Sequence, residues 1–416
     1  MKITLNYGKE TVSFTLPDKN YAGSLNPREA PGAEDGPAAV RYALEHPIGG
    51  PRLRDRVASG DRVVILVSDI TRPAPSKILL PPLLEELSAA GVPDGAIHIV
   101  FGLGVHRRQT PEEQAKLVGA DIFRRIRCLD HDIEDCRSVG ATSRGAPVEI
   151  FKQVLDADVR IVTGNLEFHY FAGFSGGAKA LAPGVCSRST IQANHRRFLH
   201  PGAKGGMIDG NPLREEIEEI GRMVGIDFML NAVLNSRKEI VLVVAGDVEA
   251  AHREGAEHIH RIFRREIEAP ADIVITSPGG FPKDIDLYQT HKAMENAQLA
   301  VRPGGTIIVA GQCGDGLGET EFGRAMIEGK SPRELIEELE RNFVLGRHKA
   351  SRVARIHSEH EIYLVSGLAP ELKKKLFVKN FDSVDAALKQ ALDVQGSDAQ
   401  VLVMPYGVST LPHLKN

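Results

Sequence analysis

The chain has little of what marks several common classes of protein. Tryptophan is absent, aromatic residues make up 5% of the 416 positions, and only four cysteines occur. These cysteines show no CxxC spacing, which argues against both a disulfide framework and a zinc finger. They are Cys128, Cys136, Cys186 and Cys313. We therefore expect a protein that keeps its thiols reduced.

An excess of charge and long hydrophobic runs are also missing. Lys and Arg number 51 against 55 Asp and Glu, for a net charge of −4, so the basic surface of a nucleic-acid-binding protein is not expected. No run approaches the roughly 18 apolar residues of a membrane-spanning helix. Residues 1–16 alternate like a strand and lack the layout of a signal peptide. Together these absences predict a soluble, cytoplasmic protein that binds neither nucleic acid nor membrane.

Short apolar runs rich in Val and Ile alternate with helix-like segments along most of the chain. Strands buried on both faces of a parallel sheet have this composition, so the alternation predicts an α/β fold with mainly parallel sheets covered by helices. Helical patterns extend over 75–91, 110–126 and 252–268, and Thr110 and Glu113 are spaced as a capping box. The strand-like runs are 62–69, 96–104, 159–165, 271–280 and 305–312.

A change of pattern near residue 268 predicts a domain boundary. We expect an N-terminal α/β domain over 1–268 and a C-terminal α/β domain over 269–395. We place the active site in the cleft between the domains, because such folds bind ligands at the carboxyl ends of their strands. The last strand-like run, 400–407, can pair with either domain. Residues 396–416 thus form a C-terminal segment that can pack back on the N-terminal domain.

Two polar clusters follow the first predicted strands. The loop 68–77 carries Asp69 and Arg72, whose planar guanidinium suits a carboxylate or phosphate, although a solvated turn has the same composition. The loop 102–107 places His106 directly after two glycines but lacks the third glycine of a dinucleotide fingerprint. A lone histidine in such a loop is more often structural than catalytic.

The densest cluster lies between residues 165 and 195. It contains His169, His195 and the run GFSGGAKA, in which alanine replaces both residues that flank the lysine of a phosphate-binding loop. Hydrolysis of nucleoside triphosphates is therefore disfavoured. Lys179 remains a candidate for covalent attachment or for a depressed pKa, the alternative being a surface lysine in a mobile loop.

The fourth cluster, residues 286–292, opens a predicted helix. Tyr288 and Lys292 are four positions apart and therefore share a helix face. Together with Gln289 they form a candidate anion site at the N-terminus of this helix. A solvated first turn is the alternative interpretation.

Four segments together resemble the nickel-pincer lactate racemase family, in the family's order and over essentially the whole chain. The third is long and hard to produce by chance. The resemblance implies two α/β domains and racemisation or epimerisation of a 2-hydroxy acid, lactate or a relative of it. The segments are SDITRPAPSK (68–77), FGLGVHR (101–107), LEFHYFAGFSGGAKALAPGVCSRSTIQANH (166–195) and LYQTHKA (287–293).

The resemblance also implies a cofactor and roles for nine residues. Family members hold nickel in the nickel-pincer nucleotide, a pyridinium-3-thioamide-5-thiocarboxylic acid mononucleotide, which biosynthesis enzymes supply as transient partners. By position, Lys179 carries the cofactor through a thioamide and His195 is the nickel ligand. His106 and His169 match the paired acid/base residues. The residues that match positions holding cofactor or substrate are Asp69, Arg72, Tyr288, Gln289 and Lys292, with Arg72 and Lys292 as the carboxylate clamp.

The implied chemistry suits a 2-hydroxy acid for physical reasons. Taking the α-hydrogen as a proton would place a second negative charge beside the carboxylate, whereas taking it as hydride leaves a neutral ketone. A metallated pyridinium can accept that hydride. Each enantiomer needs a base for its hydroxyl proton, and two histidines suit this pair of roles.

Two other interpretations stay open at this point. The chain could be a zinc or nickel hydrolase or lyase that uses His106, His169 and His195 as metal ligands, or a non-catalytic protein that binds the pincer nucleotide. Keeping two acid/base histidines argues against the second. Some family members place a tryptophan in the pocket; this chain has none, and segment 345–356, with Arg347 or His348, is the candidate for lining that region.

Overall fold

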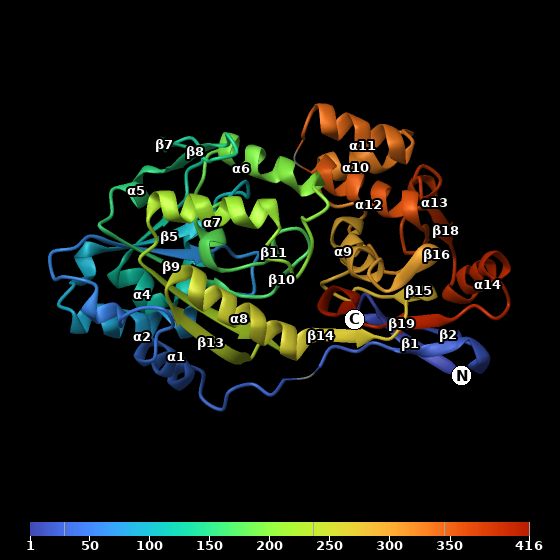
Figure 1. Ribbon diagram of the computed structural model, residues 1–416, viewed down its shortest axis with the longest axis horizontal. Coiled ribbons are helices and arrows are strands. Elements are labelled where there is room, and N and C mark those ends of the chain that lie inside the picture. Colours follow the sequence, from blue (N-terminus) through green and yellow to red (C-terminus); the bar gives the residue numbers. More distant parts are fainter. Residues whose placement is uncertain (29, 236, 345, 416) are drawn as a thin grey trace. The chain divides into compact units, whose positions relative to one another are not determined.

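The computed structural model describes the chain except for Glu29, Ser236, Leu345 and Asn416. Two compact units make up the described chain, and Figure 1 colours them along the sequence. Unit 2 is continuous, Glu29–Ile262, whereas unit 1 combines Met1–Arg28 with Phe263–Asn416. Each unit contains a six-stranded sheet that is mainly or wholly parallel, together with covering helices. The predicted fold class is confirmed.

The sheet of unit 2 determines where its candidate site lies. Its strands are β4 (Val63–Ser68), β5 (Ile97–Gly102), β6 (Arg127–Asp130), β9 (Val159–Asn165), β12 (Phe228–Leu234) and β13 (Ile240–Gly246). They lie in the order β13-β12-β9-β4-β5-β6, and within this sheet only β13 is antiparallel to its neighbour. The order reverses between β4 and β9. Ligands of such sheets bind at the carboxyl ends of the strands beside the reversal.

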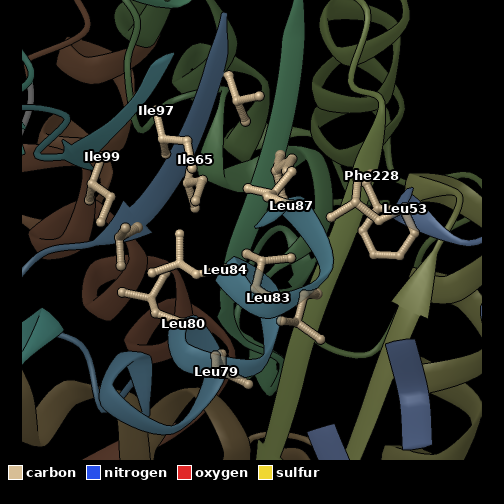
Figure 2. Packing of buried hydrophobic residues seen from close by; sticks show 14 of the residues in the cluster. Leu53, Ile65, Leu79, Leu80, Leu83, Leu84, Leu87, Ile97, Ile99 and Phe228 are labelled. Atoms are coloured by element: carbon tan, nitrogen blue, oxygen red, sulfur yellow. The ribbon is translucent and has the colours of Figure 1, made fainter. Parts of the chain in front are cut away.

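The strands of unit 2 read as continuous apolar runs because both faces of the sheet are covered. On one face, Ile65 and Ile99 pack against leucines of helix α2 (Ser76–Ala89), as Figure 2 shows. Burying each such side chain stabilises the fold by roughly 1.5–3 kcal/mol. Leu230 of β12 belongs to the same core, so Asn231, the next residue, emerges on the opposite face.

Unit 1 repeats this arrangement with a wholly parallel sheet. Its strands are β3 (Tyr21–Ser24), β15 (Ala271–Thr276), β16 (Val301–Ala310), β17 (Glu361–Val365), β18 (Lys379–Phe381) and β19 (Val401–Met404). Their order is β18-β17-β16-β15-β19-β3, so the reversal lies between β15 and β19. Helix α9 (Leu287–Ala297) follows β15. Its N-cap is Asp286, whose carboxylate accepts the N–H of Gln289, so the predicted helix start is confirmed.

The observed units differ from the predicted domains at both ends of the chain. Residues 1–28, expected in the domain 1–268, belong to unit 1, because β3 pairs with β19 and the apolar side chains of Leu5 and Phe14 lie in the core of that unit. Residues 396–416 are not a separate segment, since β19 is an interior strand of the same sheet. Pairing between strands so distant in sequence leaves no local signal.

The predicted helix over 110–126 is interrupted. The structure has α3 (Pro111–Val118), with the predicted capping box at its start, and a separate α4 (Ala120–Arg125). Gly119 separates them with a φ of +95°, a conformation that only glycine adopts easily.

The predicted helix over 252–268 is also shorter than expected. Helix α8 (Val248–Phe263) ends early, and the next residues form strand β14 (Arg264–Ile267), which pairs with β20 (Leu411–Leu414). This distant partner strand overrides the helical pattern of the sequence. Across the described residues, no helix has both the length and the apolar character that a membrane crossing requires.

Candidate active site

Six of the nine predicted site residues belong to unit 2. Asp69 directly follows β4, and His106 lies four residues beyond β5. His169 and Lys179 follow β9, which lies on the other side of the strand reversal. The parallel strands β4, β5 and β9 end at the same edge of the sheet, so their loops converge there. The other two residues in unit 2 are Arg72 and His195.

The Asp69 carboxylate is buried and lies against the ring of His106. Its Oδ2 accepts a hydrogen bond from Nδ1 of His106, and its Oδ1 accepts from the backbone N–H (3.0 Å) and the hydroxyl (2.6 Å) of Thr71. Burial acts to raise the pKa of Asp69, but the hydrogen bonds from His106 and Thr71 outweigh it, and the pKa lies below its usual value. With its Nδ1 proton directed at this carboxylate, neutral His106 keeps a lone pair on Nε2 and can accept a proton there.

Two glycines bring the loop of His106 against the segment that follows Lys179. A Cβ on Gly102 would lie 3.2 Å from Cα of Gly184, and the N–H of Gly104 donates to the carbonyl of Gly184 at 2.9 Å. Gly104 also adopts a φ of +56°. The glycines of this motif therefore serve close packing of backbone against backbone.

His169 is arranged differently from His106. Its Nδ1 accepts the N–H of Ala172 at 3.2 Å, so the neutral ring carries its proton on Nε2 and offers a donor. The ring packs edge-on against Phe171, with centroids 4.6 Å apart, and Phe171 in turn lies edge-on to His195 at 5.4 Å. Phe171 thus places two predicted site residues along one aromatic side chain.

Positive charges surround Lys179 and His169. Burial, followed by the charges of Arg72 and Arg214, lowers the pKa of Lys179 to about 7, while Glu167 acts in the opposite direction. Burial, followed by the charges of Lys179 and Arg72, also holds the pKa of His169 well below its usual value. At neutral pH, much of Lys179 is thus the uncharged amine, the nucleophilic form. This agrees with the depressed pKa considered from the sequence.

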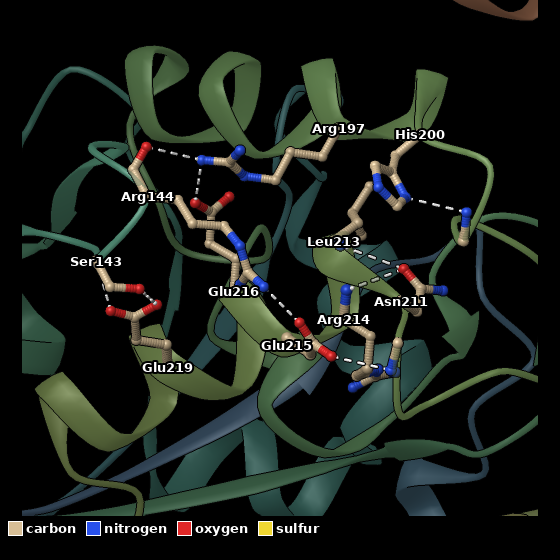
Figure 3. Close-up of polar contacts among 12 residues, drawn as sticks. Ser143, Arg144, Arg197, His200, Asn211, Leu213, Arg214, Glu215, Glu216 and Glu219 are labelled. Atoms are coloured by element: carbon tan, nitrogen blue, oxygen red, sulfur yellow. Dashed lines mark hydrogen bonds and ion pairs between the residues drawn. The ribbon is translucent and has the colours of Figure 1, made fainter.

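His195 is the last residue of helix α6 (Arg188–His195), which is anchored to helix α7 (Pro212–Val224). The side-chain amide of Asn194 donates to the carboxylate of Glu216 at 3.1 Å. Arg197 forms an ion pair with the same buried carboxylate at 2.7 Å, as Figure 3 shows. These contacts fix the end of α6 that presents His195. Within the described residues, no three His, Cys, Asp or Glu side chains are arranged to hold a metal ion.

The three other predicted residues lie near the N-terminus of α9 in unit 1. Nζ of Lys292 donates to Oε1 of Gln289 at 2.7 Å. Above the ring of Tyr288 lies Nζ of Lys349, 3.4 Å from the ring centroid, from helix α12 (Arg347–Glu359). This buried second lysine makes the start of α9 more cationic than the sequence motif indicated.

In segment 345–356, the cationic residue that contacts a predicted site residue is Lys349, whereas the sequence suggested Arg347 or His348. The guanidinium of Arg347 forms an ion pair with Glu328, and His348 is buried, with its Nδ1 accepting a backbone N–H. Lys349 approaches the predicted residues instead, and Leu345 lies outside the described residues.

Sequence reasoning also missed the buried polar residues on α7, above all Arg214. This helix buries Leu213, Ile217 and Ile220, and Arg214 lies on the same stripe, three positions before Ile217. A charged residue within the apolar stripe of an amphipathic helix was the available signal.

Comparison with known proteins gives consistent matches over nearly the whole chain. Residues 7–206 match the model of the lactate racemase N-terminal domain, and residues 267–411 match that of the lactate racemase C-terminal domain. The lactate racemase of Thermoanaerobacterium thermosaccharolyticum is 34% identical, with 98% of each chain covered, and that of Lactiplantibacillus plantarum is 32% identical, with 98% of this chain and 99% of the relative covered.

Solved structures agree with these matches. The lactate racemase apoprotein from T. thermosaccharolyticum superimposes with a TM-score of 0.92 at 33% identity, covering 99% of this chain and 100% of that one. A structural-genomics crystal structure from Thermotoga maritima has a TM-score of 0.67 at 18% identity, with 92% of this chain and 100% of that chain covered. The second likeness shows a shared fold.

Proposed function

The chain belongs to the lactate racemase family and is an isomerase, and on that premise we propose that it racemises or epimerises lactate or a related 2-hydroxy acid. The proposed reaction transfers hydride from the substrate to a nickel-pincer nucleotide tethered to Lys179 and passes through a 2-keto acid. One observation carries the proposal. A lysine with a lowered pKa and two histidines that carry their ring proton on different nitrogens follow β9 and β5, the strands on either side of β4 in one sheet.

The residues of unit 2 fit the cofactor that the family implies. With a pKa of about 7, Lys179 offers a substantial fraction of uncharged amine at neutral pH, the form that can bond to a thiocarboxyl carbon. His195 offers an imidazole, a common ligand for nickel. When bound, the cofactor supplies the hydride acceptor.

The two histidines are proposed to handle the hydroxyl proton. Held by Asp69, His106 presents an acceptor at Nε2, whereas His169, held by the N–H of Ala172, presents a donor. One turnover needs both, because a proton leaves the oxygen of one enantiomer and is returned to the oxygen of the other.

The remaining predicted residues are proposed to bind the substrate or the cofactor. Arg72 can pair with the substrate carboxylate through its planar fork. Asp69 is proposed to be a cofactor-binding residue, and it also orients His106. The candidates in unit 1 are Tyr288, Gln289 and Lys292.

Two rival functions make different predictions for the holoprotein. A hydrolase or lyase built on three imidazoles needs those side chains on one ion and leaves Lys179 unmodified, and the described side chains form no such three-ligand group. A storage protein needs the tether but no acid/base pair. Metal analysis combined with the mass of the protein distinguishes the first rival, and racemisation by the loaded protein excludes the second.

The hydride step is tested with lactate deuterated at the α-carbon. We expect L-lactate to yield D-lactate that keeps most of its deuterium, because a hydrogen that leaves as hydride is not released to water as a proton. His106→Ala and His169→Ala should each abolish net racemisation in both directions. Rapid loss of deuterium to solvent would indicate a carbanion and would contradict the hydride mechanism.

A further inference from the structure

Buried polar side chains hold the backbone between His169 and Lys179. They donate to its carbonyl groups or accept from its N–H groups, and each is at most 2% exposed. The contacts are Asn211 Nδ2 to the carbonyl of Phe171 (2.8 Å), Arg214 to the carbonyls of Ala172 and Phe174, His252 Nε2 with the carbonyl of Ser175 (2.9 Å), and Asn231 Oδ1 with the N–H of Gly177 (2.7 Å). Hydrogen bonds at this many points fix the backbone conformation of the loop.

Arg214 holds two carbonyl groups of this segment, whereas each of the other side chains holds one backbone group of it. It is fully buried, its Nε donates to the carbonyl of Ala172 at 3.1 Å, and its Nη2 donates to the carbonyl of Phe174. Its Nη1 has no hydrogen-bond partner in the described chain. A buried guanidinium without a hydrogen-bonded carboxylate is expensive to maintain, so a structural or chemical reason is expected.

Arg214 is itself placed by the first turn of α7. Asn211 caps this helix, and its Oδ1 accepts the N–H groups of Leu213 and Arg214, as Figure 3 shows. Between the two carbonyls that Arg214 holds lies Gly173, with a φ of +75°; a Cβ there would lie 1.9 Å from the carbonyl oxygen of Met207. The segment is thus both closely packed and hydrogen-bonded.

We propose that Arg214 is a positioning residue that presents Lys179 for cofactor attachment by fixing the carbonyl groups of Ala172 and Phe174 and by placing a positive charge near the lysine. This inference rests on the proposed tether. Arg214 touches neither the substrate nor the reacting atoms and acts only through the segment that it holds.

The charge has a chemical use in that position. Forming a thioamide joins Nζ of Lys179 to the carbon of a thiocarboxylic acid; the amine supplies the electron pair and loses a proton, the oxygen of that carbon leaves as water, and nothing is oxidised or reduced. An ammonium has no electron pair to supply. The pKa of Lys179 is lowered to about 7 by burial first, by the charge of Arg72 second and by the charge of Arg214 third.

The test uses cofactor-free full-length protein and the amine reagent trinitrobenzenesulfonate. Labelling of Lys179 is followed against pH by peptide mass spectrometry, and hydrogen exchange of peptides from residues 171–179 is measured on the same samples. In wild type, labelling should have its midpoint near pH 7. In Arg214→Gln the midpoint should rise; a rise of one pH unit alone reduces the uncharged fraction at pH 7 about five-fold.

Two further variants separate charge from position. Arg214→Lys keeps the charge but cannot reach both carbonyls, so the midpoint should return to near 7 while exchange of the segment stays faster than in wild type. Arg41→Gln is the control, because Arg41 pairs with Glu85 at the surface and contacts none of the segment's carbonyls. It should leave both readouts unchanged.

The contradicting results are equally specific. Folded Arg214→Gln with the wild-type midpoint and exchange would overturn the proposal. If Arg214→Gln does not fold, Arg214→Lys decides, and wild-type exchange in that variant would overturn the positioning role. Neither readout needs the cofactor, so a failure of the proposed tether would show separately, as loaded protein without a modification on Lys179.

Discussion

At the scale of single residues, the partner of each histidine ring sets which nitrogen carries the proton. Asp69 holds the Nδ1 proton of His106, whereas a backbone N–H occupies Nδ1 of His169. Their positions in the chain were predictable from motifs after strands. The difference between them was not, because it depends on a hydrogen bond to Ala172 that residue types do not reveal.

The first prediction concerns the carboxylate behind His106. Asp69→Asn keeps the shape of the side chain but removes the negative charge that stabilises a protonated imidazole. We expect racemisation to fall by roughly 10²–10⁴-fold, the usual contribution of a general acid/base group. Asp158→Asn, which removes a carboxylate paired with Arg62 at the surface, serves as the control and should keep full activity. Steady-state racemisation at saturating substrate measures both, and wild-type turnover in Asp69→Asn would remove this residue from the proton path.

The second prediction follows from the lowered pKa of Lys179. This pKa falls from 10.5 to about 7 on folding, so between these values the unfolded chain binds a proton that the folded chain does not. The resulting penalty is fully present below pH 7 and disappears as the pH rises toward 10.5. Cofactor-free Lys179→Met should therefore be more stable than wild type at pH 7, with a smaller difference near about pH 9.5. Urea unfolding at both pH values measures this, and a difference independent of pH would contradict the shift.

At the scale of elements, the buried strands were the most predictable part of the fold. β4, β5 and β9 lie within the predicted runs, because burial on both faces forces a continuous apolar composition. Features that depend on distant partners were not predictable: Arg264–Ile267 has a helical pattern yet pairs with a strand near the C-terminus. The polar contacts of α7 could not be predicted from the sequence for the same reason, since their acceptors are backbone carbonyls of another segment.

The third prediction tests how tightly the segment before Lys179 is packed. Gly173→Ala combines a positive φ with a Cβ placed 1.9 Å from a backbone oxygen, so it should lower the free energy of unfolding by about 3 kcal/mol or more. Gly145→Ala is the matched control, with a φ of +78° and nothing within 4 Å of the added Cβ. It should lose only about 1 kcal/mol. Chemical denaturation compares the two variants. Equal decreases in the free energy of unfolding would show that the segment before Lys179 is not tightly packed.

At the scale of the whole molecule, each unit has its own sheet and core, but only unit 2 is continuous in sequence. The sequence indicated two α/β domains because the β/α alternation runs along both. The sequence could not indicate that β3 joins the C-terminal sheet. Nothing in the composition of residues 21–24 shows that this strand pairs with β19.

The fourth prediction follows from this division. A chain of residues 29–262 should fold alone and unfold cooperatively, because all six strands of its sheet lie within that span. Residues 263–416 alone should fold poorly, because β19 then has an unpaired edge and the core lacks Leu5 and Phe14. Thermal unfolding followed by circular dichroism distinguishes the two, and a cooperative transition in the second fragment would contradict the assignment of residues 1–28.

The proposed link between Lys179 and the cofactor is tested most directly by mass spectrometry of the protein produced together with cofactor-biosynthesis enzymes and nickel. We expect an added mass on the peptide that contains Lys179, in proportion to racemase activity, and neither the mass nor the activity in Lys179→Met. In His195→Ala the organic adduct should remain while nickel content falls. Full racemase activity in protein whose Lys179 is unmodified would contradict the account.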